Sequence, residues 1–225
     1  MPTVDALCAE SSTAVPLPTL VAADVACRRG NRQLFRGASF SVAPGRAVWL
    51  RGRNGRGKTS LLRLMAGLAV PDAGAITCDG ISVRQRGDHA RGMVYVAHAS
   101  ALKDDLTVTE SLHFLALIHG QPCDAESLRL ALGRVGMGTR RDAMVRTLSQ
   151  GQRRRATLAR LALESRPSIW ILDEPYDALD SDGVACVNQL LQEHLARGGS
   201  VLLTSHQSGG TAAPPMAVFD LDTCA

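Results

Sequence analysis

The sequence is short of aromatic residues, lysine and long apolar runs, and these shortages limit what the protein can be. Aromatic residues are 4% of the 225 residues, which leaves few side chains on which a single-stranded nucleic acid could stack its bases. No apolar run approaches the ~20 residues that a transmembrane helix needs, so we expect the chain not to span a membrane. Arginine carries almost all of the positive charge, since Lys58 and Lys103 are the only lysines. The net charge of +4 therefore indicates a compositional bias more than an acidic partner.

Cysteine spacing and the N-terminal residues set further limits. The six cysteines show no CxxC pair, so the sequence predicts neither a zinc site nor a c-type haem attachment site. The first nineteen residues contain Asp5 and Glu10 but no lysine or arginine, unlike a secretory signal. We expect residues 1–19 to be a flexible extension or a misplaced start, and residues 20–225 to form one domain. We also expect a cytoplasmic protein with free thiols.

A phosphate-binding loop follows the apolar strand at 47–50 and precedes a helical pattern at 60–65. Its sequence fits G-x-x-x-x-G-K-[ST], in which glycines let backbone N–H groups face phosphate oxygens. Lys58 is expected to reach the β- and γ-phosphates of ATP, Thr59 to supply a hydroxyl to Mg²⁺, and Ser60 to add a phosphate contact. The predicted ATP-binding residues of the loop are Gly52, Arg53, Asn54, Gly55, Arg56, Gly57, Lys58, Thr59 and Ser60. The two arginines could strengthen nucleotide binding or point to solvent.

Two carboxylates follow a second apolar run, at residues 168–172. Such a run is typical of a strand buried on both faces of a parallel sheet, and ligands bind at the carboxyl end of these strands. Asp173 is suited to the Mg²⁺ shell. Glu174, one residue on, could accept a proton from an attacking water.

A five-residue LSxGQ motif lies between these two motifs and resembles the signature of ATP-binding-cassette (ABC) ATPases. The resemblance implies that the signature caps the γ-phosphate held by a second copy of the chain. It also implies that Asp180 belongs to the D-loop and that His206 is the switch histidine that contacts the γ-phosphate. We expect the run Arg153-Arg154-Arg155 to face solvent or the nucleotide of the second copy. The signature residues are Leu148, Ser149, Gln150, Gly151 and Gln152.

Two positions differ from the common ABC pattern. His98 lies where the family usually has the glutamine that senses Mg²⁺ and water, so the resemblance places His98 near the metal. The aromatic residue that usually stacks on adenine is missing, and Arg28 or Arg29 lies there. A guanidinium can stack on a base, and Arg29 is our candidate for that contact. Both differences could instead be drift at tolerant positions.

Five local segments carry a closer resemblance, namely residues 29–35, 95–98, 107–112, 170–175 and 204–207. Together they resemble the ATP-binding subunit of cytochrome c maturation (haem exporter) complexes. This resemblance implies a homodimer at the cytoplasmic face of a bacterial inner membrane, docked on integral membrane subunits of that complex. ATP would drive haem export or the release of a haem-loaded chaperone. Ala99, Ala101 and Leu102 could line a docking groove. We expect no nucleic-acid partner and no direct haem binding by this chain.

The order of patterns predicts an α/β fold of the P-loop NTPase class. Strands near 48–50, 93–97, 169–172 and 201–204, separated by helical stretches, favour a RecA-like, mostly parallel sheet. Short runs around Ile76 and Ile81 suit a small antiparallel β region. Residues 98–166 are expected to be an inserted helical subdomain that carries the signature.

Two other functions stay open. The chain could be the ATPase of another small ABC transporter. It could also be a soluble ABC protein acting on DNA or ribosomes, which is disfavoured because a second cassette and a long coiled-coil insertion are missing. A GTPase is weaker still, because no NKxD motif is present.

Overall fold

The structure is a computed structural model that describes residues 19–85, 92–207 and 209–224. The predicted N-terminal extension lies outside the described residues, apart from Thr19.

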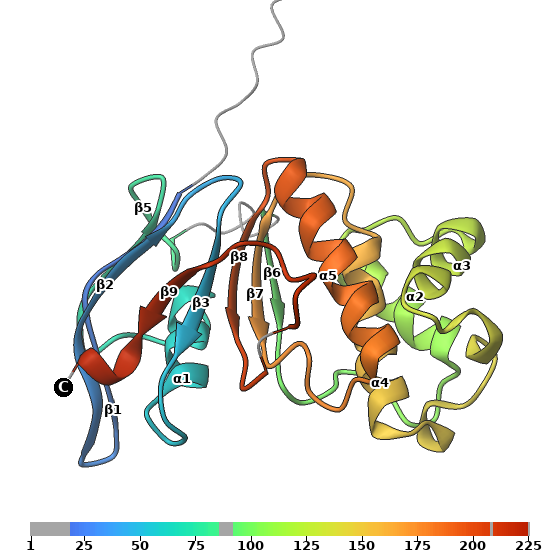
Figure 1. The fold of residues 1–225 in the computed structure, drawn as a ribbon, viewed down its shortest axis with the longest axis horizontal. Helices are drawn as coiled ribbons and strands as arrows, with labels where there is room; N and C mark the ends of the chain where they lie inside the picture. Colours follow the sequence, from blue (N-terminus) through green and yellow to red (C-terminus); the bar gives the residue numbers. More distant parts are fainter. Residues whose placement is uncertain (1–18, 86–91, 208, 225) are drawn as a thin grey trace, which may run out of the picture.

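A parallel sheet forms the centre of the fold (Figure 1). Its strands lie in the order β6-β7-β8-β3-β9, and every neighbouring pair is parallel. The four strands expected from the sequence are confirmed, whereas the edge strand β9 is not predicted by it. The strands are β3 (Ala47–Arg51), β6 (Met93–Val96), β7 (Ile169–Asp173), β8 (Ser200–Thr204) and β9 (Ala217–Asp220).

Both faces of this sheet are covered, which explains its continuous apolar strands. Successive side chains of a strand point to opposite faces. In β7, Ile169 and Ile171 pack in the core shared with the antiparallel sheet and helix α1 (Lys58–Met65). Trp170 and Leu172 pack instead in the core shared with the other helices.

An antiparallel sheet packs beside the parallel one, with α1 against both (Figure 1). Its order is β2-β1-β4-β5. The small antiparallel region expected around Ile76 and Ile81 is confirmed by β4 and β5, but the sequence analysis does not predict the long hairpin of β1 and β2. The strands are β1 (Leu20–Arg29), β2 (Arg32–Val42), β4 (Ala73–Cys78) and β5 (Ile81–Ser82).

The stretch predicted to be helical does form helices, and these lie on the other side of the parallel sheet (Figure 1). Described residues between 98 and 166 contain no strand, only an isolated bridge between Thr107 and Met144. Capping explains where two helices begin, because Thr107 with Glu110 forms a capping box, as does Ser149 with Gln152. The helices are α2 (Val108–Ile118), α3 (Ala125–Arg134), α4 (Gln150–Ala162) and, after β7, α5 (Ser181–Ala196).

The structure also bears on the expectations about membrane crossing and free thiols. Among the described residues, no helix combines the length and apolar character that crossing a bilayer requires. The described Cys27, Cys123, Cys186 and Cys224 have free thiols.

A buried histidine ties α5 to the central sheet. His194 is 0% exposed and stacks on Trp170, with ring centroids 3.7 Å apart and an interplanar angle of 9°. Its Nε2 lies 2.8 Å from the carbonyl oxygen of Ser168, and Nδ1 has no hydrogen-bond partner. Gly199 makes room for the ring, because a Cβ there would lie 2.2 Å from Nε2. Burial lowers the pKa of His194 to about 4.

We predict that acid destabilises the fold through His194. The folded chain binds this proton less readily than the unfolded chain, so the stabilisation is complete above pH 6.5 and is lost as the pH falls towards 4. The free energy of unfolding should fall by about 3 kcal/mol over this pH range, since each unit of difference between the folded and unfolded pKa corresponds to about 1.4 kcal/mol. Urea unfolding between pH 7.5 and 4.5 measures it. His194→Phe should unfold with a shallower pH dependence, and an unchanged slope would refute the assignment.

Candidate nucleotide-binding site

A cleft of about 640 Å³ lies at the carboxyl ends of β3, β6, β7 and β8. These ends meet at one edge because the four strands are parallel. Most of the predicted site residues line this cleft together. They are Arg29, Arg53, Asn54, Gly55, Gly57, Lys58, Thr59, Ser60, His98, Asp173, Glu174 and His206. The sequence analysis does not predict the remaining lining residues, Leu34, Arg63, Tyr95, Ala97 and Ala99.

The loop between β3 and α1 has the conformation that an anion cradle needs. Gly57 precedes the first residue of α1 with a left-handed φ of 106°, and its missing side chain matters for packing. A Cβ there would lie 3.1 Å from both Leu34 and Phe35 of β2. Lys58 turns back over the loop, with Nζ donating to the carbonyl oxygen of Gly52 at 2.7 Å. An ammonium group and the start of a helix thus face the cleft, where they can attract phosphate.

The two arginines of the loop lie differently, since Arg53 lines the cleft and Arg56 does not. The Arg53 side chain is 91% exposed, while its backbone N–H donates to Asp222 Oδ2 at 3.1 Å. Arg56 is directed to the C-terminal segment, where Nη2 donates to the carbonyl oxygen of Cys224 at 2.9 Å. Arg56 Nε also lies 3.5 Å from Asp222 Oδ1. The Arg56 side chain therefore takes neither of the expected positions, at the nucleotide or in solvent, and Gly52 likewise does not line the cleft.

A hydroxyl and a carboxylate from different elements meet at the floor of the cleft. Thr59 Oγ1 donates to Asp173 Oδ2 at 2.8 Å, and Thr204 Oγ1 donates to Asp173 Oδ1 at 2.8 Å. Asp173 is 2% exposed, and its charge together with burial raises the pKa of Tyr95, burial being the larger cause. The carboxylate is thus oriented by two hydroxyl groups, one of which the sequence analysis does not assign.

This pair fits Mg²⁺. Mg²⁺ binds in proteins through one or two oxygen ligands and completes its shell with water and substrate phosphates. Among the described residues, no group of three or more His, Cys, Asp or Glu side chains forms a self-sufficient metal site. Thr59 and Asp173 supply the oxygens that Mg²⁺ prefers. His98 is exposed at the cleft, and its imidazole is a softer ligand that suits other metals better.

Glu174 is held in an unusual backbone conformation. Its φ is 51°, in the left-handed region that costs energy for a residue with a side chain. The backbone N–H of Glu174 donates to Thr204 Oγ1 at 3.0 Å. Its Oε2 accepts a hydrogen bond of 2.9 Å from the backbone N–H of His206, whose Nε2 lies 3.4 Å from Oε1. The Glu174 side chain is 15% exposed, so it reaches the cleft while its surroundings fix its direction.

The signature motif does not line the cleft of its own chain. Ser149 is exposed at the start of α4. Gly151 lies against Ala178, which precedes Asp180 in the predicted D-loop, since a Cβ on Gly151 would be 2.5 Å from the carbonyl oxygen of Ala178. Asp180 forms an ion pair with Arg155 and caps α5 by accepting from the N–H of Gly183 at 2.9 Å. The signature and the D-loop are therefore joined to each other on a surface separate from the cleft.

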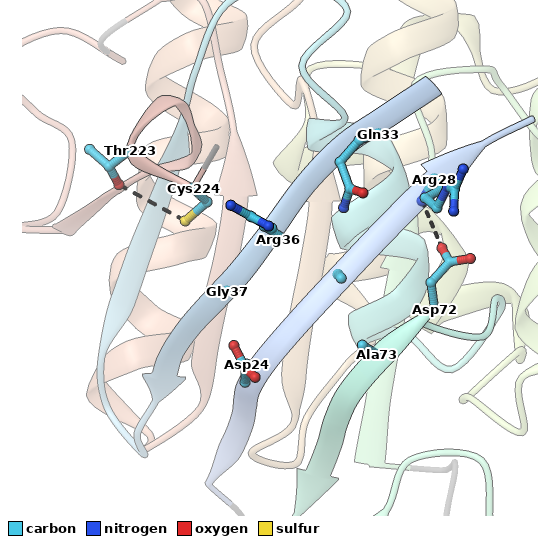
Figure 2. A pocket seen from close by; sticks show the side chains of 10 residues that line it. Asp24, Arg28, Gln33, Arg36, Gly37, Asp72, Ala73, Thr223 and Cys224 are labelled. Atoms are coloured by element: carbon cyan, nitrogen blue, oxygen red, sulfur yellow. Dashed lines mark hydrogen bonds between the residues drawn. The ribbon is translucent and has the colours of Figure 1, made fainter. Parts of the chain in front are cut away.

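A second hollow, of about 650 Å³, carries none of the predicted site residues except Arg28, the alternative to Arg29 at the position of the missing aromatic residue. It crosses β1 and β2 beside Thr223 and Cys224 (Figure 2). Figure 2 shows carboxylates and arginines along it, and the backbone N–H of Arg28 donates to Asp72 Oδ2 at 2.7 Å. This hollow does not match the first as an anion site, because neither the phosphate loop nor the start of α1 lines it.

Comparisons with known proteins agree with the geometry. Residues 35–177 match the family model of ABC transporters. The chain is 47% identical over 209 residues to the cytochrome c biogenesis ATP-binding export protein CcmA of Aromatoleum aromaticum, covering 92% of this chain and 97% of that protein. This chain belongs to the ABC transporter family. The CcmA protein of Nitrosomonas europaea is 45% identical over 193 residues, which cover 85% of this chain and 90% of that protein.

Solved structures of this family share the fold. An ATP-binding subunit of an ABC transporter superposes with a TM-score of 0.73 at 26% identity, covering 83% of this chain and 79% of that one. A putative ABC transporter ATP-binding protein from Pyrococcus furiosus gives a TM-score of 0.78 and covers 92% of this chain and 99% of that one. At 22% identity, the second likeness supports the fold alone.

Thr204 is the main site residue that the sequence analysis does not assign. The sequence does contain a signal for Thr204, because this residue ends an apolar strand, and that strand lies next to β7 in the parallel sheet. Residues at the carboxyl ends of neighbouring strands come together, so a hydroxyl there was a candidate.

We predict that Thr204→Val destabilises the protein by about 1–3 kcal/mol, because a buried carboxylate oxygen and the Glu174 N–H both lose their partner. Thr204→Ser keeps the hydroxyl and is the matched control. Guanidinium unfolding of both variants gives the difference. Equal stability of Thr204→Val and Thr204→Ser would show that these two hydrogen bonds contribute nothing.

Proposed function

We propose that this chain is the ATP-hydrolysing subunit of an ABC complex for cytochrome c biogenesis. The observation that carries the proposal is the convergence of Lys58, Thr59, Asp173, Glu174 and His206 on one cleft. Relatives 42–47% identical to the chain are named cytochrome c biogenesis ATP-binding export proteins, and this supports the pathway. Another small ABC transporter, or a protein acting on DNA or ribosomes, has no comparable support.

The loop residues bind the phosphates of ATP in this proposal. Lys58 exchanges its hydrogen bond to Gly52 for the β- and γ-phosphates, which places positive charge where negative charge develops during transfer. Ser60 and the loop amides add contacts. Arg29 and Leu34 line the same cleft and form the surface available to the base, with the Arg29 guanidinium stacked on it.

Thr59 and Asp173 hold Mg²⁺, which when bound polarises the phosphate oxygens. Glu174 accepts the proton of the attacking water at its carboxylate. His206 stays beside that carboxylate and contacts the γ-phosphate. The position of Glu174 therefore depends on whether His206 has a γ-phosphate to contact. His98 is exposed at the cleft. It couples nucleotide binding to the position of the helical region that follows it.

A second copy of the chain completes the site in this proposal. Leu148 to Gln152 lie off their own cleft, and Ser149 and Gln150 are exposed. A head-to-tail pair would place these residues over the γ-phosphate of the partner, with Asp180 beside them. The isolated chain is then a poor ATPase.

We predict that Glu174→Gln still binds ATP but hydrolyses it at least ~100-fold more slowly, because the general base is lost. With the γ-phosphate retained, the variant should accumulate as an ATP-held dimer. Steady-state phosphate release by the assembled complex and size-exclusion chromatography at saturating ATP and Mg²⁺ are the measurements. Lys58→Ala is the control that should neither hydrolyse ATP nor dimerise. A Glu174→Gln chain that stays monomeric within this test would contradict the shared site.

We also propose a membrane partner for this chain. The chain would lie peripherally at the cytoplasmic face of a bacterial inner membrane and dock on integral membrane subunits, with haem or a haem-loaded chaperone as their cargo. Phe114, Leu117 and Ile118 are 45%, 57% and 57% exposed on one face of α2. This apolar face fits an apolar helical segment of such a subunit better than the predicted groove, since Leu102 is 9% exposed.

We predict that Leu117→Gln combined with Ile118→Gln lowers holocytochrome c production by at least about fivefold, because central apolar contacts carry most of the energy of an interface. ATP binding by the isolated chain should not change. Leu130→Gln on α3 removes one apolar side chain of similar exposure, 52%, elsewhere on the helical region and is the control. Haem staining of periplasmic cytochromes measures the output. Normal production in the double variant would exclude this face as the docking site.

A further inference from the structure

The three arginines after the signature do not behave alike. Arg153 forms an ion pair with Asp104 at 2.6 Å, and Arg155 pairs with Asp180. Arg154, in contrast, is 6% exposed and points into the protein. The expectation that all three face solvent or a second nucleotide is therefore wrong for Arg154.

The buried guanidinium of Arg154 binds main-chain carbonyl groups at the ends of two neighbouring strands. Nη1 donates to the carbonyl oxygen of Ala97 at 2.8 Å and to that of His98 at 3.4 Å. Nη2 donates to the carbonyl oxygens of Asp173 at 2.6 Å and Glu174 at 2.8 Å. The planar fork of arginine suits such a set, because its donors have fixed directions.

The charge of Arg154 is held without an ion pair among the described residues. Burial lowers the pKa of the guanidinium, and the more distant charges of Asp177, Asp173 and Glu174 oppose that effect. A guanidinium nevertheless stays charged in proteins. Placing a desolvated charge on four carbonyl groups is costly, which makes a simple solubility or packing role a poor explanation.

The four carbonyl groups belong to segments that have to keep their place. Glu174 has its left-handed φ of 51°, and a conformation of this kind persists only where the surroundings fix it. Ala97 and His98 begin the loop that leaves β6 for the helical region. Both segments line the cleft, and both are tied to the same side chain of α4.

We infer that Arg154 is a positioning residue that fixes the backbone of Glu174 and His98 relative to the signature helix. Helix α4 begins directly after Ser149, so one rigid element carries both the signature and the side chain that holds Glu174. When the signature of one chain engages the nucleotide of a second copy, its movement is thereby transmitted to Glu174 of the same chain as that signature. The inference rests on the proposed function, since it assigns Arg154 to the same hydrolysis.

Three variants test this role in the assembled complex. Arg154→Gln loses the charge and most donors, whereas Arg154→Lys keeps the charge but cannot reach all four carbonyl groups. Both should lower kcat by at least about tenfold, because small misplacement of a catalytic group is costly. The affinity for ATP, measured by calorimetry, should stay within about threefold, since the hydrogen bonds of Arg154 within the described residues go to the ends of β6 and β7 and not to the phosphate loop. Arg129→Gln, which breaks only an exposed ion pair with Glu126 within α3, is the control and should keep its kcat.

The split between kcat and affinity separates positioning from a loss of fold. If Arg154→Gln fails to fold, Arg154→Lys alone decides the question. A kcat close to that of the wild type in Arg154→Lys, or an equal loss of kcat and affinity in either folded variant, would overturn the inference. A wild-type complex without ATPase activity would refute the proposed function instead.

Discussion

The parallel arrangement of the central strands is the constraint on which the rest of the structure depends. It brings the ends of four strands to one edge, so that residues far apart in the sequence, such as Thr59, Asp173 and Thr204, hydrogen-bond there. It also leaves two apolar faces that need cover. The antiparallel sheet with α1 covers one face. The helical core covers the other, with α5 against β8 and with α2 and α3 packed on α4, and the same layers that bury the core thus also position the cleft.

The sequence predicts much of the cleft because its motifs are local. The phosphate loop and the acidic strand end each lie within a few residues, and their chemistry can be read without knowledge of the fold. The long hairpin escapes prediction for a physical reason. Strand β1 pairs with β2 through register shifts between Ala22 and Cys27, and Asp24 has a positive φ, so the apolar alternation that marks a strand is broken.

Long-range contacts of arginine form the second class of feature that the sequence cannot predict. Arg153, Arg154 and Arg155 are adjacent and chemically identical, yet one pairs with Asp104, one is buried and one pairs with Asp180. Only the path of α4 beneath the strand ends distinguishes them. A run of like charges therefore indicates the composition of a helix, and the tertiary structure decides what each member does.

The contact between the phosphate loop and the C-terminal segment has an evolutionary consequence. Asp222 accepts from the Arg53 N–H and lies beside Arg56, whose guanidinium also binds Cys224, so an arginine in the loop is balanced by a carboxylate at the other end of the chain. A relative that replaces one member of this pair gains little by keeping the other. Among related chains, positions 56 and 222 should therefore change together, and a chimaera that exchanges the last residues between relatives has to carry the matching loop.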